Sequence, residues 1–213
     1  MSYSIPSLRP FITPITIASG YGVSPSLLML HGETVVDSSA NNWTLTNTSV
    51  TASSAQKKFG SNSLLFNGSS SNLGLPNNAA FSLSTYTVES WIYVSSLASI
   101  NGFYASQVGS MACLIGTNGS VGITDQAGSP NYSTAGLITT GSWIHLAIVN
   151  NAGITVYVNG SVALTQSAKN MTYGLIGSVQ GFGAYFNGYM DEFRMSNSAI
   201  YTSTFTPPTA AFA

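Results

Sequence analysis

Six carboxylates and two imidazoles are all the acid–base groups that the 213 residues offer for catalysis. The carboxylates are Glu33, Asp37, Glu89, Asp125, Asp191 and Glu192, and the imidazoles are His31 and His145. A retaining glycoside hydrolase needs two carboxyl groups about 5 Å apart. Only Asp191 and Glu192 are adjacent in sequence, and adjacent residues of a strand point to opposite faces of a sheet. The sequence therefore predicts a protein that is not an enzyme and disfavours a secreted glycan hydrolase.

Cysteine and histidine are too few for a cofactor or zinc site. Cys113 is the single cysteine, so no internal disulfide can form. It lies in the apolar run 111–115, which predicts a buried thiol. His145 lies in a strand-like segment and is expected to make a cross-strand hydrogen bond. Zinc sites need clusters of these residues, and the sequence holds none, so no cofactor is predicted.

Charged residues are scarce and limit the classes of partner. They make up 5% of the chain, against about 25% in ordinary domains. Nucleic-acid binding needs many Lys and Arg contacts to phosphates, and five basic residues are too few. No apolar run reaches the roughly 18 residues of a membrane span. No basic segment precedes the apolar N-terminus, and Pro10 and Pro14 interrupt it, so no secretory signal is expected.

The elements that carry these residues are predicted to be strands. In 143–149, Ile144, Leu146 and Ile148 alternate with other residues at the period of a strand with one core-facing side. Asn-Gly occurs five times, most clearly at Asn159-Gly160, and favours tight hairpin turns. An all-β, two-sheet antiparallel sandwich is expected over 27–213. Its predicted strands are 27–31, 63–67, 86–94, 111–115, 121–124, 143–149, 154–158, 173–176 and 189–195.

The first 26 residues have a different composition. Prolines recur among apolar residues there, which favours extended, irregular backbone. Residues 1–26 are therefore predicted to form an extended arm that fastens the domain to neighbouring subunits, as a homotrimer. The side chains expected to make the assembly contacts are Ile5, Leu8, Phe11, Ile12, Ile15 and Ile17.

Four segments together resemble a known family. They are 61–68 (SNSLLFNG), 86–92 (YTVESWI), 143–147 (WIHLA) and 188–194 (GYMDEFR). In this order they resemble the laminin-G-like, concanavalin-A-like jelly-roll domains, especially those of phage virion proteins. The resemblance implies a jelly-roll sandwich in which Trp91 and Trp143 are mostly buried. It implies much less about function, because this fold has many functions.

The resemblance also implies a calcium ligand at Asp191, in the closing strand. The family's second aspartate is missing, because the expected Phe-Asp-Gly reads His31-Gly32-Glu33 here, while the turn that begins at Asp37 is kept. Calcium takes six to eight oxygen ligands, so little effect of calcium is expected. The alternative is that Asp191 and Arg194 simply pair or hydrogen-bond locally.

Carbohydrate binding would need aromatic platforms and directional polar groups. Trp43, in the turn 41–44, is the candidate glycan contact, with a structural role as its alternative. Four tyrosines are further loop aromatics, each with the same alternative: Tyr104, Tyr132, Tyr173 and Tyr185.

These observations lead to two functional hypotheses. The first is a non-enzymatic phage virion protein, a capsid decoration (cement) protein that clamps neighbouring subunits of the major capsid protein. It would be made in the host cytoplasm and located on the capsid surface. The alternative is a tail-fibre or receptor-binding module that recognises host surface glycans.

Overall fold

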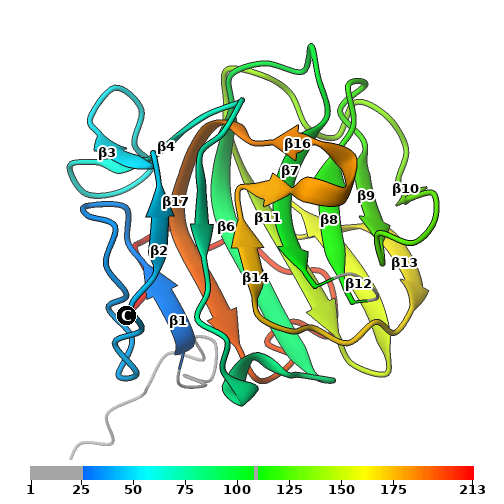
Figure 1. Ribbon diagram of the computed structural model, residues 1–213. Coiled ribbons are helices and arrows are strands. Elements are labelled where there is room, and N and C mark those ends of the chain that lie inside the picture. Colours follow the sequence, from blue (N-terminus) through cyan, green and yellow to red (C-terminus); the bar gives the residue numbers. More distant parts are fainter. Residues whose placement is uncertain (1–25, 108–109) are drawn as a thin grey trace, which may run out of the picture.

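The computed structural model describes residues 26–107 and 110–213, and these form two antiparallel sheets packed face to face (Figure 1). Helix is limited in the described residues to two short 3-10 turns, η1 (Ala79–Phe81) and η2 (Gln180–Phe182). The predicted all-β sandwich is confirmed. The arm residues from Ile5 to Ile17 lie outside the described residues. No helix in the described part of the chain is long and apolar enough to cross a membrane.

The larger sheet has eight strands in the order β13-β12-β11-β6-β17-β4-β3, with β1 also paired to β17. Its strands are β1 (Ser26–Leu30), β3 (Thr51–Ser53), β4 (Ser63–Asn67), β6 (Tyr86–Val94), β11 (Trp143–Asn150), β12 (Gly153–Val158), β13 (Ser161–Ser167) and β17 (Asn187–Ser196).

The smaller sheet has seven strands in the order β10-β9-β8-β7-β14-β5-β2. Its strands are β2 (Thr46–Thr48), β5 (Asn72–Gly74), β7 (Asn101–Ser106), β8 (Ala112–Ile115), β9 (Val121–Thr124), β10 (Asn131–Tyr132) and β14 (Gly174–Ile176). A short hairpin of β15 (Ser178–Val179) and β16 (Ala184–Tyr185), with η2 between them, packs on the outer face of this sheet against Ala105, Ala112 and Leu114.

The core lies between the sheets and follows the predicted alternation. Ile144, Leu146 and Ile148 of β11 are all buried in it, and so is Cys113. Burial also raises the pKa of the Cys113 thiol. Trp91 is buried as predicted, whereas Trp143 at the edge of the outer face is only half-buried.

Two backbone features set the register of the larger sheet. Asn159 and Gly160 have φ angles of 49° and 77° and connect β12 to β13, which confirms the expected two-residue hairpin turn. In β17, Asp191 pairs with Trp91 but Arg194 pairs with Glu89, so β17 has one extra residue there. This is a β-bulge, with Glu192 at a φ of 52°.

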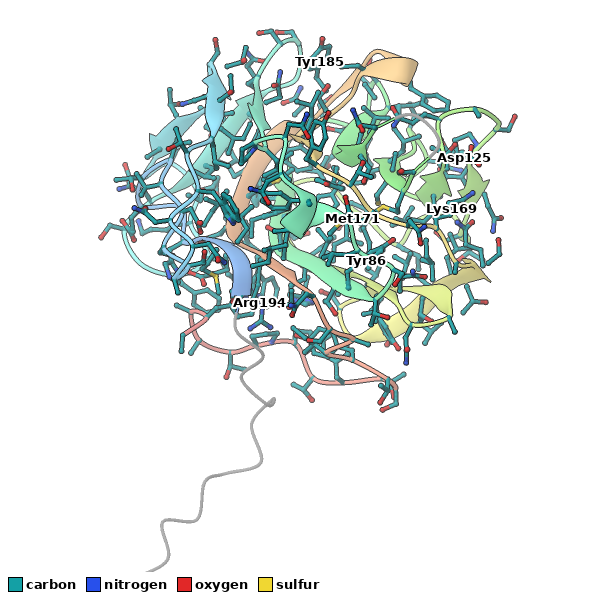
Figure 2. The ribbon with its side chains drawn as sticks, turned by 60° about the horizontal axis from the view of Figure 1, so that its bottom comes forward. Tyr86, Asp125, Lys169, Met171, Tyr185 and Arg194 are labelled. Atoms are coloured by element: carbon teal, nitrogen blue, oxygen red, sulfur yellow. The ribbon has the colours of Figure 1, made fainter. Side chains whose placement is uncertain are left out.

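The C-terminal segment, 197–213, covers part of the outer face of the larger sheet. The rings of Tyr201 and Phe205 stack with centroids 3.5 Å apart, and both rings contact His145 and Tyr157. Figure 2 shows this segment in pale red below the label of Arg194. Because of this cover, His145 and Ala147 are buried although they face away from the core.

Candidate functional site

A pocket of about 330 Å³ opens on the outer face of the smaller sheet. It lies where β5 and β7 end and β14 begins, beside the β15–β16 hairpin. Its polar and aromatic lining comes from Ser106, Gln107, Gln126, Tyr173 and Gln180. These residues come from four separate parts of the sequence, which the sheet brings together.

Small residues on β7 and β14 leave room for this pocket. Gly174 pairs with Ser106, and a Cβ at Gly174 would collide with the carbonyl oxygen of Ala105. The strand therefore needs glycine at this position for its close approach to β7. Ala105 and Ser106 add little volume of their own, so the floor of the pocket is close to the backbone.

Gln126 has an orientation that its hydrogen bonds fix. Its Nε2 donates to the carbonyl oxygen of Ser106 at 2.7 Å, and its backbone N–H donates to Thr124 Oγ1 at 2.9 Å. The residue has a φ of 65°, in the left-handed region. Because Nε2 is committed to a carbonyl, Oε1 remains available to accept a hydrogen bond from a ligand.

Gln107 and Tyr173 form a second polar pair at the pocket. Gln107 Nε2 donates to the Tyr173 hydroxyl at 2.7 Å, so the hydroxyl hydrogen of Tyr173 and Oε1 of Gln107 remain available to a ligand. The Tyr173 ring packs against the core, which holds the hydroxyl in place. Gln180 is exposed at the rim, and its side chain has no hydrogen-bond partner among the described residues.

The lining is uncharged throughout. None of its described residues is a carboxylate or a cation. The nearest charges in sequence are on Asp125, whose Oδ2 lies 3.0 Å from Lys169 Nζ; Figure 2 labels both residues, which lie side by side. The hydrogen bond from Lys169 lowers the pKa of Asp125. An uncharged pocket with amide and hydroxyl groups suits a neutral, hydroxyl-bearing ligand.

A second polar cluster is buried under the C-terminal segment. Glu89 accepts hydrogen bonds from Arg194 Nε at 2.9 Å and Nη2 at 2.6 Å, and from the Tyr201 hydroxyl at 2.7 Å. His145 Nε2 lies 3.2 Å from Glu89 Oε2, but neither ring nitrogen of His145 makes a hydrogen bond within the described residues, so the expected cross-strand hydrogen bond is not formed. Burial alone would raise the pKa of Glu89, but contacts with His145, Arg194 and Tyr201 hold that pKa below its usual value. The cluster joins β6, β11, β17 and the C-terminal segment.

Arg194 therefore pairs with Glu89 and not with Asp191, so the two residues do not pair with each other, and each of them hydrogen-bonds separately within the protein. The bulge at Glu192 is the physical reason, because it brings Arg194 directly opposite Glu89. Glu192 itself accepts hydrogen bonds from His31 Nδ1 at 3.0 Å and from the backbone N–H of Phe212 at 2.7 Å.

Asp191, whose role as a calcium ligand stays a prediction, has one of its two carboxylate oxygens engaged with the protein. Its Oδ2 accepts hydrogen bonds from the backbone N–H groups of Lys58 and Phe59, and its buried Oδ1 has no partner among the described residues. Both oxygens of Glu33 and of Asp37 accept hydrogen bonds from the protein. One free carboxylate oxygen falls short of the six to eight oxygens that calcium takes. Among the described residues, no group of three or more acidic, histidine or cysteine side chains is placed to hold a metal ion.

Trp43, the predicted glycan contact, is half-buried and engaged with the protein. Its Nε1 donates to the carbonyl oxygen of Leu27 at 2.9 Å, and its ring lies 5.2 Å from that of Phe81. This arrangement favours the structural role for Trp43, and its contact with a glycan stays a prediction. Tyr104, predicted to be a loop aromatic, lies in β7 and is fully buried.

Sequence reasoning identified Tyr173 but missed the glutamines of the pocket. The chain has five glutamines, and Gln107, Gln126 and Gln180 line this one pocket. Gln126 and Gln180 come shortly after the predicted strands 121–124 and 173–176. Glutamines placed just after strand ends are the signal in the sequence that could have found the site.

Comparisons with known proteins give a family and a fold. A family model described as the concanavalin A-like lectin/glucanases superfamily matches residues 67–203. No curated protein matches the chain in sequence.

Three solved structures illustrate the shared fold. The receptor-binding domain of a botulinum neurotoxin C/D mosaic serotype has a TM-score of 0.63 and 15% identity, and the match covers 83% of this chain and 49% of that one. A structure of botulinum neurotoxin type C, described as a toxin whose cell entry depends on interaction with two ganglioside molecules, has a TM-score of 0.60 and 15% identity. That match covers 83% of this chain and 49% of the neurotoxin chain. A candidate carbohydrate-binding protein from Bacteroides ovatus has a TM-score of 0.52 and 20% identity, with 63% and 43% covered. The chain thus spans half or less of each of these structures.

Proposed function

The chain belongs to the concanavalin A-like lectin/glucanase superfamily, and on this basis we propose that it is a non-enzymatic domain that binds neutral carbohydrate in the pocket between β7 and β14. The observation that carries this function is the gathering of three glutamines and a tyrosine around one hollow of about 330 Å³.

The chemistry of the pocket matches that of a sugar. Sugar hydroxyls both donate and accept hydrogen bonds, and neutral amide and hydroxyl side chains do the same. Oε1 of Gln126 and Oε1 of Gln107 would accept from ligand hydroxyls, while Tyr173 and Gln180 would donate. The first three groups are held by hydrogen bonds within the protein, so binding would cost little ordering of side chains.

The structural neighbours support the same class of function. Their descriptions name receptor binding, gangliosides and carbohydrate. At this low identity the likeness carries the fold only, so their ligands come to this chain as part of the proposal. A receptor-binding module that recognises host surface glycans is the role we favour.

The positions of the carboxylates support a binding role without catalysis. The described lining of the pocket holds no carboxylate, and Glu89 is covered by the C-terminal segment and paired with Arg194. Glycoside hydrolysis by the usual mechanism needs two carboxyl groups around the scissile bond.

The location on a phage capsid, the clamping of the major capsid protein and the homotrimer remain predictions. They depend on residues 1–25, which are outside the described residues, and on the phage part of the family resemblance. The comparisons bear on neither, and the neighbours favour the glycan-binding alternative.

A glycan array with the full chain tests the function. We expect binding to neutral oligosaccharides that falls sharply in Gln126→Ala, because this change removes the fixed acceptor. Gln56→Ala is the matched control, since Gln56 does not line the pocket, and it should bind like the parent. Absence of binding to every glycan, or equal binding by Gln126→Ala and the parent, would refute this site.

A further inference from the structure

A second pocket, of about 270 Å³, lies on the same outer face at the opposite end of β9. The turn between β8 and β9 and the strand β10 form it, and Thr117, Asn118 and Tyr132 supply its exposed polar and aromatic groups. Ser120 lies here, directly before β9, whereas Gln126 of the first pocket follows the end of β9. The length of the strand therefore separates the two pockets.

The ring of Tyr132 covers two glycines. Tyr132 pairs directly with Gly122 across β10 and β9. A Cβ at Gly122 would meet Cε1 of the ring, with Cδ1 at 2.6 Å and Cζ at 3.0 Å, and a Cβ at Gly116 would lie 3.5 Å from Cε1. Three ring atoms at such similar distances place the backbone of Gly122 under the face of the ring rather than at its edge. One face of the ring is thus seated on the strand.

The other face of this ring is open to solvent. Tyr132 is 37% exposed and is one of the few large hydrophobic residues on the described surface with this much exposure. An aromatic ring fixed on one face and open on the other can stack against an apolar surface with little loss of conformational freedom.

Hydrogen-bonding groups line the same pocket as this ring. Asn118 Oδ1 accepts hydrogen bonds from the backbone N–H of Ser120 at 3.1 Å and from Ser120 Oγ at 2.7 Å. These bonds fix the amide, and its Nδ2 has no partner among the described residues. The hydroxyls of Thr117 and Tyr132 are likewise without a partner there. No charged residue is among the described lining.

We propose that this pocket is a second carbohydrate site, which binds one neutral sugar ring stacked on the exposed face of Tyr132 and hydrogen-bonded by Asn118 Nδ2. A sugar ring combines an apolar face of C–H groups with hydroxyls at its rim, which matches a fixed aromatic face bordered by donors. An anionic sugar would find no countercharge in this pocket. The site is separate from the first pocket and does not depend on it.

The test is an NMR titration of the full chain with the methyl glycosides of glucose, galactose, mannose and N-acetylglucosamine. We expect at least one of them to shift the side-chain amide signals of Asn118. Tyr132→Ala should weaken that binding about tenfold, and Gly122→Ala should also weaken it, because the new methyl group displaces the ring. Tyr132→Phe keeps the stacking face and should therefore bind more tightly than Tyr132→Ala. The backbone amide spectrum checks that each variant is folded.

The outcomes separate this site from the first pocket. Shifts at Gln126 without shifts at Asn118 would overturn the second site and leave the proposed function standing. Shifts at Asn118 that persist unchanged in both Tyr132→Ala and Gly122→Ala would overturn the stacking. Shifts at Asn118 without shifts at Gln126 would support the second site and count against the first. Silence at both residues with all four sugars would overturn both.

Discussion

Glu89 Oε1 accepts two hydrogen bonds from the guanidinium of Arg194, at 2.9 Å from Nε and 2.6 Å from Nη2. The two residues face each other across β6 and β17, and both are buried. Phe212 of the C-terminal segment covers the guanidinium, whose Cζ lies 4.0 Å from the centroid of the ring. The pair therefore fastens the end of the chain to the sheet as well as joining two strands.

Glu89→Gln should destabilise the protein by about 3–5 kcal/mol, because the buried charge of Arg194 would lose its partner. The midpoint of urea unfolding measures this change. Glu33→Gln is the matched control at an exposed glutamate and should leave the midpoint close to that of the parent. The pKa of Glu89 is lowered from 4.5, so its stabilising contribution is present above about pH 4.5 and is lost as the pH falls through the lower folded-state value. Equal midpoints for the two variants would show that the pair does not stabilise the fold.

Leu146→Ala should cost about 2–5 kcal/mol, because Leu146 is fully buried between the sheets and its truncation leaves a cavity. Val162→Ala is the control on the exposed surface, where Val162 is 50% exposed, and it should change stability by less than about 0.5 kcal/mol. Thermal unfolding of both variants measures the difference. A Leu146→Ala variant that melts with the parent would contradict the facing of β11.

The period of two and the turn residues were enough to predict an antiparallel sandwich, although strands such as β7 and β13 were not among those predicted. Leu146 faces the core because its strand alternates, and Asn159-Gly160 turns the chain because both residues tolerate a positive φ. The bulge at Glu192 could not be predicted, since one extra residue leaves no mark on a sequence of mixed polar and apolar residues. The burial of His145 could not be predicted either, because it depends on a segment more than 50 residues away in sequence.

The candidate sites were only partly predictable. Aromatic residues in loops drew attention to Tyr132 and Tyr173, but nothing local distinguishes these from Tyr104, which the fold buries. Gln107 and Gln126 become neighbours of one pocket only when β7 and β9 join one sheet. Ligand sites built from several strands depend on pairings that a single sequence does not specify.

Asp191 should make stability depend on pH in the direction opposite to Glu89. Burial raises the pKa of Asp191 from 3.8 to about 6. The folded protein therefore binds the proton more tightly than the unfolded chain, and stability from this group is lost as the pH rises from about 4 to about 6. Asn at this position does not titrate, so the stability of Asp191→Asn relative to the parent should increase over that range and stay level above it. Thermal unfolding between pH 3.5 and about 8 measures this difference.

Calcium provides the contrasting outcome for the same residue. If Asp191 held calcium, a chelator would lower the melting temperature of the parent at pH 7, and Asp191→Asn would abolish that change. We expect little effect of the chelator, because only one carboxylate oxygen there is free. A large chelator effect that Asp191→Asn removes would contradict this expectation and the pH profile together.

Deleting residues 1–25 should leave the sandwich folded, because β1 begins at Ser26. If the deleted residues fasten the chain to other subunits, as their apolar composition predicts, the truncated protein should lose the oligomer of the full chain. Sedimentation velocity of both proteins measures the oligomeric state, and binding to phage particles measures attachment. An unchanged oligomer and normal particle decoration would show that these residues have no part in assembly.

Binding of glycans in the pocket between β7 and β14 should be insensitive to salt and to the charge of Lys169. No charged residue is among the described lining of the pocket, so screening has little to act on. Lys169 pairs with Asp125, the residue before Gln126 in sequence, and it is the cation that we would expect to bind an anionic sugar. Lys169→Met should therefore leave the affinity for neutral glycans within about twofold of the parent. Calorimetric titrations at low salt and at an ionic strength of about 0.5 M check both expectations, because exposed charges are strongly screened at the higher ionic strength. Affinity that falls steeply with salt, or that disappears in Lys169→Met, would mean that the pocket selects anionic sugars and that Lys169 leaves Asp125 to bind them.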